Sequence, residues 1–422
     1  MSQHTKEGQP VSTQAQPVWE QLEGWVRGQI QGLLQQVLEE EVTELLGRCR
    51  CARKPAVDAT PGYRNGHGQP RRVSLTCGTV ELRRPRVRGL EERFESRLLP
   101  LFARRTREVG QLLPELYLHG LALGDFELAL RGLLGEGAPL SPASVNRLRA
   151  TWEGQFAQWN QRRLDDRQLV YAWADGIYVK AGLEKDKAAL LVIVGALSDG
   201  RKEVLAVVAG FRESTESWLT LLRALRDRGL PPPWLLIADG GMGIWSAADQ
   251  VWPDTAQQRC WNHKIVNVLD KLPKRLQAQA KELLTPIPYA PSCQEAEQQR
   301  DRFVTTYQAT FPEAVETLAR DWERMVSFYA FPHAHWKHLR TSNPVESPFA
   351  AVRLRTEAGK RYKKVPGATA LIWRLLMVAE QRFRRLDAPA LLAAVYAGQR
   401  YADGQPIRLP QPAAPATKKE AA

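Results

Sequence analysis

Three consecutive runs of β-branched, aromatic and small apolar residues constrain the fold of this chain more than any other feature. The runs are LVYAWADGIYVK (169–180), AALLVIVGALSDG (188–200) and KEVLAVVAGF (202–211). Asp199-Gly200 separates the second run from the third, and Asp-Gly between two strand-like runs is a strong signal for a β-hairpin. The sequence therefore predicts three antiparallel strands in succession.

A helix, two short strands and a second helix are expected next. Apolar residues with the spacing of a buried helix face occur at Trp218, Leu221, Leu222 and Leu225. After a proline-marked break at 231–233, WLLIAD reads as a buried strand ending at Asp239, and a short strand around QQRC precedes another helix. This order is that of an RNase H-like α/β fold, with a mixed five-stranded sheet and flanking helices, if the fourth strand pairs parallel to the first.

An all-helical insertion is expected to divide this core. Residues 273–335 are polar and helical in pattern, and the helix start TSNPVES and a further apolar helix follow them. We therefore assign 165–272 and 336–395 to the core. Residues 1–17 are polar and 396–422 are rich in proline and alanine, so we expect a disordered leader and tail.

Residues 18–160 are expected to form a mainly helical DNA-binding region. An apolar stripe from Trp19 to Leu38 predicts an amphipathic helix, and VSLTCGTVELRRP alternates like two strands around Gly78 in an arginine-rich stretch. Further on, a helix, a Gly/Pro turn and a helix opening at Ser141-Pro142 resemble a helix-turn-helix. The second helix would bring Asn146, Arg147 and Arg149 to a DNA groove. An ordinary helical hairpin with solvated arginines is the alternative.

The balance of charges favours a polyanionic partner. The chain has 59 Lys and Arg against 46 Asp and Glu, a formal net charge of +13 and a pI near 9.6. Nucleic acid is the first candidate, through counterion release. The first residues contain no apolar signal segment, no run reaches the ~18 apolar residues of a membrane span, and the five cysteines are scattered. We expect a cytoplasmic protein without a membrane partner.

Three carboxylates are predicted to meet at one end of the sheet. Asp175 lies in the first strand, Asp239 ends the fourth, and Glu346 lies at a helix start. Converging carboxylates need a counter-ion, and Mg²⁺ prefers oxygen ligands. A pair of ions ~3.5–4 Å apart supports in-line phosphoryl transfer. Local alternatives are a bulge at Asp175, a turn or cap at Asp239, and a capping box at Glu346 with Asn343 as N-cap and Pro344 as the first helical residue.

Two further motifs are compatible with metal or phosphate binding. Cys260 and His263 have C-x-x-H spacing at a strand-to-helix junction, but packing and hydrogen bonding are favoured over zinc because no partner ligands are evident. The histidines of HAHWKH fit no single helix or strand face, so phosphate contact or structural hydrogen bonding is favoured over a transition-metal site. The loop ADGGMG lacks the residues of a nucleotide-binding motif, and no nucleotide is expected.

Four blocks of the sequence resemble the mutator-type DDE transposases of bacterial insertion sequences. They are YAWADGIYVK, WLLIADGGMGIWSA, RCWNHKIVNVLDKLPK and HWKHLRTSNPVESPFAAVRLRT, within a resemblance from about residue 20 to about residue 390. The resemblance implies an RNase H-like domain whose Asp-Asp-Glu triad binds two Mg²⁺ ions, with Mn²⁺ able to substitute, and a helical insertion before the Glu. The triad falls on Asp175, Asp239 and Glu346, and the family's C-x-x-H element on Cys260 and His263.

The resemblance also implies a transposase that binds the terminal inverted repeats of its own element and cuts and joins DNA with the triad. Double-stranded DNA is then the partner, as repeat ends and as target. A homodimer or larger assembly would hold two ends together, associated with the nucleoid. Arg353, two helical turns beyond Glu346, is the leading candidate for a phosphate contact, ahead of Arg355 and Lys360. A DNA-binding repressor without catalysis and a metal-dependent nuclease remain alternatives.

Overall fold

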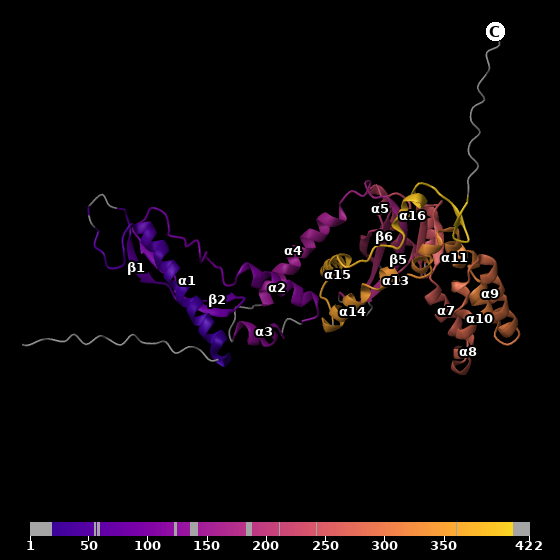
Figure 1. Cartoon of the computed structure of the whole chain (residues 1–422), viewed down its shortest axis with the longest axis horizontal. Helices are drawn as coiled ribbons and strands as arrows, with labels where there is room; N and C mark the ends of the chain where they lie inside the picture. Colours follow the sequence, from indigo (N-terminus) through magenta and orange to yellow (C-terminus); the bar gives the residue numbers. More distant parts are fainter. Residues whose placement is uncertain are drawn as a thin grey trace, which may run out of the picture. The chain divides into compact units, whose positions relative to one another are not determined.

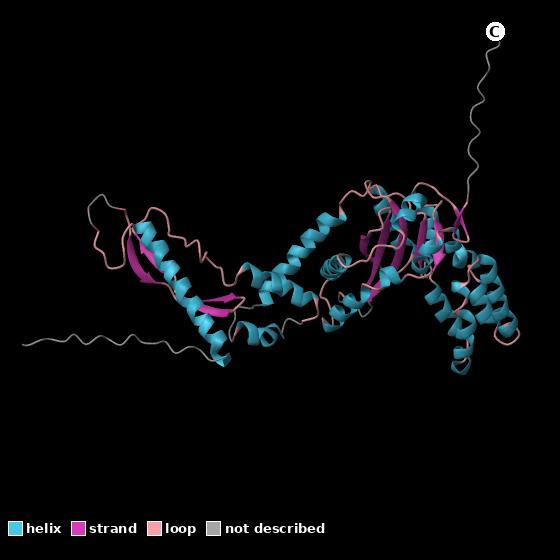
Figure 2. Cartoon of the chain, in the orientation of Figure 1, coloured by secondary structure: helices cyan, strands magenta, loops and turns pink. Residues whose placement is uncertain are grey.

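The computed structural model describes residues 19–407, apart from 55, 57–59, 122–124, 136–141, 183–187, 211, 242 and 360. The chain divides into two compact units, Met1–Asn146 and Arg147–Ala422. Figure 1 labels the elements along the chain, and Figure 2 separates helices from strands. The predicted leader and residues 408–422 of the predicted tail lie outside the described residues.

A long helix packed on short strands forms part of the first unit. A 3-10 turn, Trp19–Gln21, leads into α1, Leu22–Leu46. The predicted helix is confirmed. The predicted apolar stripe, however, starts too close to the N-terminus, since Trp19 is 83% exposed and Leu33 is 60% exposed. The reason is that α1 joins the apolar core of this unit only from Leu34 onward, where it packs with residues that include Val73, Val80 and Leu82.

Four strands accompany α1, two more than predicted. β2, Arg71–Leu75, and β3, Gly78–Leu82, form the predicted hairpin, in which Gly78 has a φ of +120° that favours glycine. The additional antiparallel pair is β1, Tyr63–His67, with β4, Pro85–Arg88. Their sequences, YRNGH and PRVR, lack an apolar alternation, so no local pattern indicated them.

Three helices follow the strands. α2 covers Arg107–Leu118, α3 covers Phe126–Leu134 and α4 covers Pro142–Asn160. α4 begins where the sequence predicted, but the division between the two units falls inside it, after Asn146. The turn between α3 and α4 lies outside the described residues, so the helix-turn-helix stays a prediction.

A mixed sheet forms the centre of the second unit. β5 (Leu169–Val179), β6 (Ala188–Leu197) and β7 (Lys202–Gly210) pair antiparallel in succession. β8 (Leu235–Ala238) pairs parallel to β5, and β9 (Ala256–Arg259) pairs parallel to β8. The order β7-β6-β5-β8-β9 confirms the predicted five-stranded mixed sheet and its parallel fourth strand.

Helices bury one apolar face of this sheet. α5, Thr215–Asp227, begins after Ser214, whose side chain accepts the Ser217 N–H. It buries the predicted residues Trp218, Leu221, Leu222 and Leu225. α6, Ile244–Val251, was not predicted, and it packs with α5 in the same core. α7, Trp261–Leu269, begins directly after Cys260.

The next part of the second unit is helical throughout. It consists of α8 (Lys274–Leu284), a 3-10 turn (Ile287–Tyr289), α9 (Cys293–Tyr307), α10 (Pro312–Ala319), α11 (Trp322–Val326), two 3-10 turns (Ser327–Ala330 and His333–His335) and α12 (Trp336–Leu339). The buried Lys264 links this segment to α7, because its ammonium donates to the Thr317 and Arg320 carbonyl oxygens at 2.6 and 2.5 Å. His335 is also buried, with Nδ1 2.9 Å from the Tyr171 hydroxyl, which fits the structural interpretation of HAHWKH.

The described part of the second unit ends with four helices and a small hairpin. The helices are α13 (Asn343–Glu346), α14 (Phe349–Ala358), α15 (Val365–Glu380) and α16 (Pro389–Tyr396). The hairpin pairs β10, Tyr401–Ala402, with β11, Gln405–Pro406. The predicted disorder is therefore wrong for 396–407: Tyr401 is buried, and the Gly404 N–H donates to the Tyr329 carbonyl at 3.1 Å. Across the part of the chain that is described, none of the helices combines the length and apolarity needed to cross a membrane.

Candidate active site

The parallel pairing of β5 with β8 brings Asp175 and Asp239 side by side. Ala174 of β5 is in register with Ala238 of β8, and each alanine is followed directly by one of the two aspartates. Both strands are buried up to this point, while the aspartates are half-buried. The carboxylates therefore lie at the boundary between the apolar core and solvent, where a substrate can reach them.

Asp175 carries the clearest electrostatic signature of the site. Its pKa is raised to about 7, chiefly by burial and then by the negative charges of Glu346, Asp239 and Glu213. The Gly176 N–H, which donates to Asp175 Oδ1 at 2.8 Å, opposes this shift. Burial and neighbouring negative charge both favour the protonated form of a carboxyl group. The charges of the other two predicted carboxylates thus act on Asp175.

Glu346 reaches the site from the short helix α13. Ser342, rather than Asn343, is the N-cap, because its carbonyl accepts the N–H groups of Val345 and Glu346 at 3.0 and 3.1 Å. The prediction of an Asn343 cap, with Pro344 as the first helical residue, is wrong by one position. The Ser342 hydroxyl donates to Glu346 Oε1. The carboxylate therefore accepts a hydrogen bond from a side chain, whereas in a capping box it would accept one from a backbone N–H.

A fourth carboxylate, Glu213, belongs to the site and was missed in the sequence. It lies between β7 and α5, is 8% exposed, and forms a hydrogen bond with the Tyr178 side chain. Burial and then the charge of Asp239 raise its pKa. Glycine in the middle of a strand indicates a close approach by another group, so Gly176 was the available signal.

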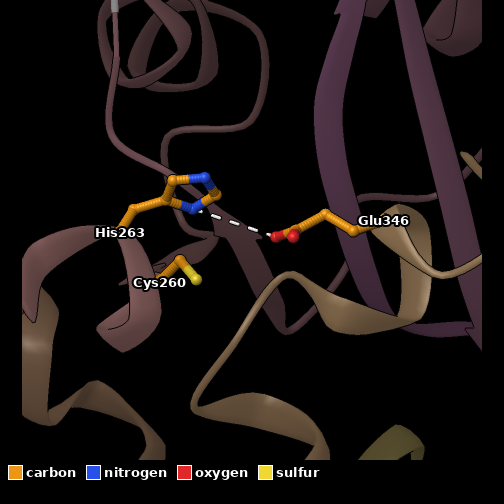
Figure 3. Close-up of side chains that lie close together, drawn as sticks. All are labelled: Cys260, His263 and Glu346. Carbon is orange, nitrogen blue, oxygen red and sulfur yellow. Dashed lines mark ion pairs between the residues drawn. The ribbon is translucent and has the colours of Figure 1, made fainter. Parts of the chain in front are cut away.

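The two residues of the C-x-x-H element, Cys260 and His263, lie next to Glu346. Figure 3 shows Cys260 and His263, from the start of α7, facing Glu346 of α13. His263 Nδ1 lies 3.8 Å from Glu346 Oε1. A hydrogen bond to Cys260, followed by the charges of Cys260, Glu346 and Asp239, raises the pKa of His263 to about 9 against the effect of burial.

The donor set suits a hard divalent cation. Asp175, Asp239, Glu213 and Glu346 offer only carboxylate oxygens, the ligand type that Mg²⁺ and Mn²⁺ prefer. The raised pKa of Asp175 and Glu213 means that ionising these groups together is costly without added positive charge. A cation would supply that charge. The chemistry of the donor set is therefore compatible with Mg²⁺, and the bound metal stays a prediction.

The predicted DNA-contact residues have different outcomes. Arg353 is exposed and lines a surface groove of about 630 Å³ with Gly176 and Tyr178. Arg355 is only 2% exposed, so its predicted DNA contact is not supported. Lys360 and the side chain of Asn146 lie outside the described residues. On α4, Arg147 is exposed and Arg149 is half-buried, so neither prediction is tested.

A second basic surface lies in the first unit, in the arginine-rich stretch noted in the sequence. A groove of about 660 Å³ is lined by residues that include Arg71, Arg72, Arg84, Arg86, Arg93 and Arg104, with Glu81 as the acidic member. Two of these side chains are fixed: Arg71 donates to the Pro100 carbonyl and Arg84 to the Phe94 carbonyl. Partial burial and then the charges of Arg93 and Arg71 lower the pKa of Arg84. Arginines held this close suit a polyanion.

Comparisons with known proteins agree on one family. A family model described as "Transposase, Mutator family" matches residues 1–385. The transposase for insertion sequence element IS6120 of Mycolicibacterium smegmatis is 40% identical over 309 residues, 73% of this chain and 96% of the relative. The transposase for insertion sequence element IST2 of Acidithiobacillus ferrooxidans is 41% identical over 286 residues, 67% and 97% of the two chains. The chain therefore belongs to the mutator family of transposases.

Proposed function

We propose that this protein is an insertion-sequence transposase that binds terminal inverted repeats and catalyses metal-dependent cleavage and strand transfer of DNA. The observation that carries the proposal is the convergence of Asp175 and Asp239 from parallel strands with Glu346 from α13, expressed in the raised pKa of Asp175. Family membership and the names of the relatives support the same activity. The strand order and the helical segment before Glu346 support an RNase H-like core with a helical insertion.

Asp175, Asp239 and Glu346 would hold two Mg²⁺ ions, with Glu213 as an additional carboxylate. When bound, such ions lower the cost of charge on the attacking and leaving oxygens of a phosphoryl transfer. The chain's own contribution is to fix the carboxylates: the Gly176 N–H holds Asp175 Oδ1, and the Gly241 N–H holds Asp239 Oδ1 at 2.7 Å. The Ser342 hydroxyl holds Glu346.

The basic surfaces would bind the DNA. Arg353 lies in the same groove as Gly176, next to Asp175, where the phosphate that reacts must be placed. The arginine groove of the first unit offers several guanidinium groups to a phosphate backbone and supports end binding by the N-terminal region. A homodimer or larger assembly would bring two ends together.

The test is cleavage and joining by the full chain on DNA that carries the element's own ends. We expect Asp175→Asn, Asp239→Asn and Glu346→Gln each to abolish cleavage in Mg²⁺ and in Mn²⁺ while end binding is retained. The exposed Asp254→Asn is the matched control and keeps full activity. Normal cleavage by any of the three variants would contradict the assignment.

The reaction product distinguishes a transposase from a nuclease and from a DNA-binding protein without catalysis. Joining of a cut 3′ end to a second duplex identifies a transposase, and cutting without joining identifies a nuclease. Binding of authentic ends without cleavage in either metal identifies a DNA-binding protein without catalysis.

A further inference from the structure

Cys260, His263 and Glu346 form a compact group of three different metal-ligating side chains. A ligand atom from each, the thiol sulfur, a ring nitrogen and a carboxylate oxygen, lies within 4.8 Å of the other two. Figure 3 shows the three side chains turned toward a common point between α7 and α13. The spacing C-x-x-H alone gave only two ligands, and the tertiary structure supplies the third.

We propose that Cys260, His263 and Glu346 bind a thiophilic divalent cation of the zinc class. A thiolate and an imidazole select Zn²⁺ or Co²⁺ over Mg²⁺, which prefers oxygen ligands and near-octahedral geometry. The site is therefore chemically distinct from the carboxylate site formed around Asp175 and Asp239, although the two share Glu346.

The geometry is close to that of a zinc site before the ligands contract. Zinc bonds of ~2.0–2.3 Å at tetrahedral angles place ligand atoms roughly 3.4–3.6 Å apart. The distance from His263 Nδ1 to Glu346 Oε1 is 3.8 Å, and all three separations are below 4.8 Å. Small side-chain rotations close this difference. The side chains of His263 and Glu346 are 39% and 27% exposed, which leaves the edge of the group open to water as a fourth ligand, although Cys260 and the His263 Nδ1 atom are themselves buried.

Hydrogen bonds connect the start of α7, which supplies Cys260 and His263, to the segment that supplies Glu346. The Ser342 N–H donates to Cys260 Sγ at 3.3 Å, and the Ser342 hydroxyl donates to Glu346 Oε1. The Trp261 N–H donates to the Arg340 carbonyl at 2.9 Å, which ties the start of α7 to the segment before α13. Polar contacts that orient ligands in this way are a regular part of protein metal sites.

Sharing Glu346 couples the new site to catalysis, and this consequence rests on the proposed function. A carboxylate bound to the thiophilic ion is not free to complete the catalytic carboxylate set. Zn²⁺ is therefore expected to inhibit cleavage in the presence of Mg²⁺, and Cys260→Ser is expected to relieve the inhibition. The alternative is that Cys260 and His263 only hydrogen-bond to each other, in which case their substitution leaves metal binding unchanged.

The direct test uses Co²⁺ as a spectroscopic probe on the full chain. Cys49 and Cys51 are exposed and are replaced by serine in every sample, so that they do not bind the probe. We expect one Co²⁺ per chain, with the visible bands of a tetrahedral site and a thiolate charge-transfer band, and displacement by Zn²⁺. Cys260→Ser should remove the charge-transfer band. His263→Gln and Glu346→Gln each remove a direct ligand and should weaken Co²⁺ binding by more than the ~10–100-fold that loss of an outer-shell partner costs.

Two controls exclude binding by another thiol and loss of folding. Cys293→Ser removes another thiol and should leave the cobalt spectrum unchanged, and circular dichroism verifies that each variant is folded. If folded Cys260→Ser binds Co²⁺ with the affinity and bands of the parent protein, the site does not exist. Asp239→Asn separates the two proposals: it should lose cleavage and retain the cobalt bands. If it cleaves normally and retains the bands, the proposed function is wrong and the thiophilic site stands.

Discussion

The carboxylate of Glu213 occupies the space that a side chain at position 176 would need. A Cβ built on Gly176 would lie 2.7 Å from the Glu213 Cδ atom, far inside van der Waals contact. This relationship joins the central strand β5 to the loop before α5. It places a fourth carboxylate beside Asp175, where its charge contributes to the raised pKa of Asp175.

Glu213→Gln should lower metal-dependent cleavage about 10–100-fold, because it removes a charge that helps to bind the cation while the amide preserves packing. The measurement is the cleavage rate as a function of Mg²⁺ concentration, and the required concentration should rise. Glu216→Gln, an exposed carboxylate in the first turn of α5, is the control. An unchanged Mg²⁺ dependence would remove Glu213 from the site.

Gly176→Ala should disturb the site through sterics alone. The added methyl forces the Glu213 carboxylate away, so both cleavage and the thermal stability of the protein should fall. Gly154→Ala is the matched control: nothing lies within 4 Å of its added methyl in α4, and it should raise stability by up to ~1 kcal/mol. Full cleavage by Gly176→Ala would show that Glu213 has no role in the reaction.

Asp175 should make the metal-free protein less stable as pH rises. Its pKa is about 7 in the folded chain against 3.8 for an unperturbed aspartate, so the folded state binds the proton more tightly. Stability from this residue is present below about pH 4 and is lost as pH rises to 7, by at most roughly 4 kcal/mol. Metal-free Asp175→Asn should therefore unfold at a higher temperature than the parent at pH 8, with a smaller difference at pH 5. Addition of Mg²⁺ at pH 8 should stabilise the parent more than the variant; equal unfolding temperatures at pH 8 would contradict the expectation.

The arginine groove should bind DNA mainly through phosphates. Arg72→Ala with Arg86→Ala removes two exposed guanidinium groups, so affinity for end-containing and unrelated DNA should both fall. The slope of log affinity against log salt should decrease by ~0.9 for each phosphate that the double variant no longer neutralises. Arg97→Ala, an exposed arginine paired with Glu44 in the same unit, is the control. An unchanged salt slope in the double variant would exclude the groove as a phosphate site.

The C-terminal hairpin should stabilise the second unit. Ending the chain after Gln399 removes Tyr401 from its buried position and the Asp403 carboxylate that accepts the Cys293 N–H at 2.8 Å. We expect a decrease of about 2–3 kcal/mol in the free energy of unfolding. A chain that ends after Ile407 should retain full stability. Identical unfolding temperatures for the two truncated chains would show that the hairpin contributes nothing.

Much of the core could be predicted because its signals are local. The runs that form β5, β6 and β7 are apolar over strand-like lengths, and Asp199-Gly200 specifies the turn between the last two. Asp175 and Asp239 followed from this pattern, because a parallel fourth strand brings the end of β8 beside the middle of β5, where Asp175 follows Ala174. The α6 helix, between the glycine-rich loop and β9, was missed because its 8 residues are too few for a helical period to be recognised in the sequence.

Contacts between distant segments could not be predicted in this way. Glu213, Cys260 and His263 reach the site only through the packing of segments that are far apart in the sequence, and no local pattern encodes that packing. The same reason explains the buried Arg355 and the ordered hairpin at Tyr401: whether a side chain is solvated depends on which remote element covers it. The sequence by itself determined the strands of the five-stranded sheet, the family resemblance and the candidate triad. The tertiary structure decided which further side chains join that triad, because those contacts come from segments far apart in the chain.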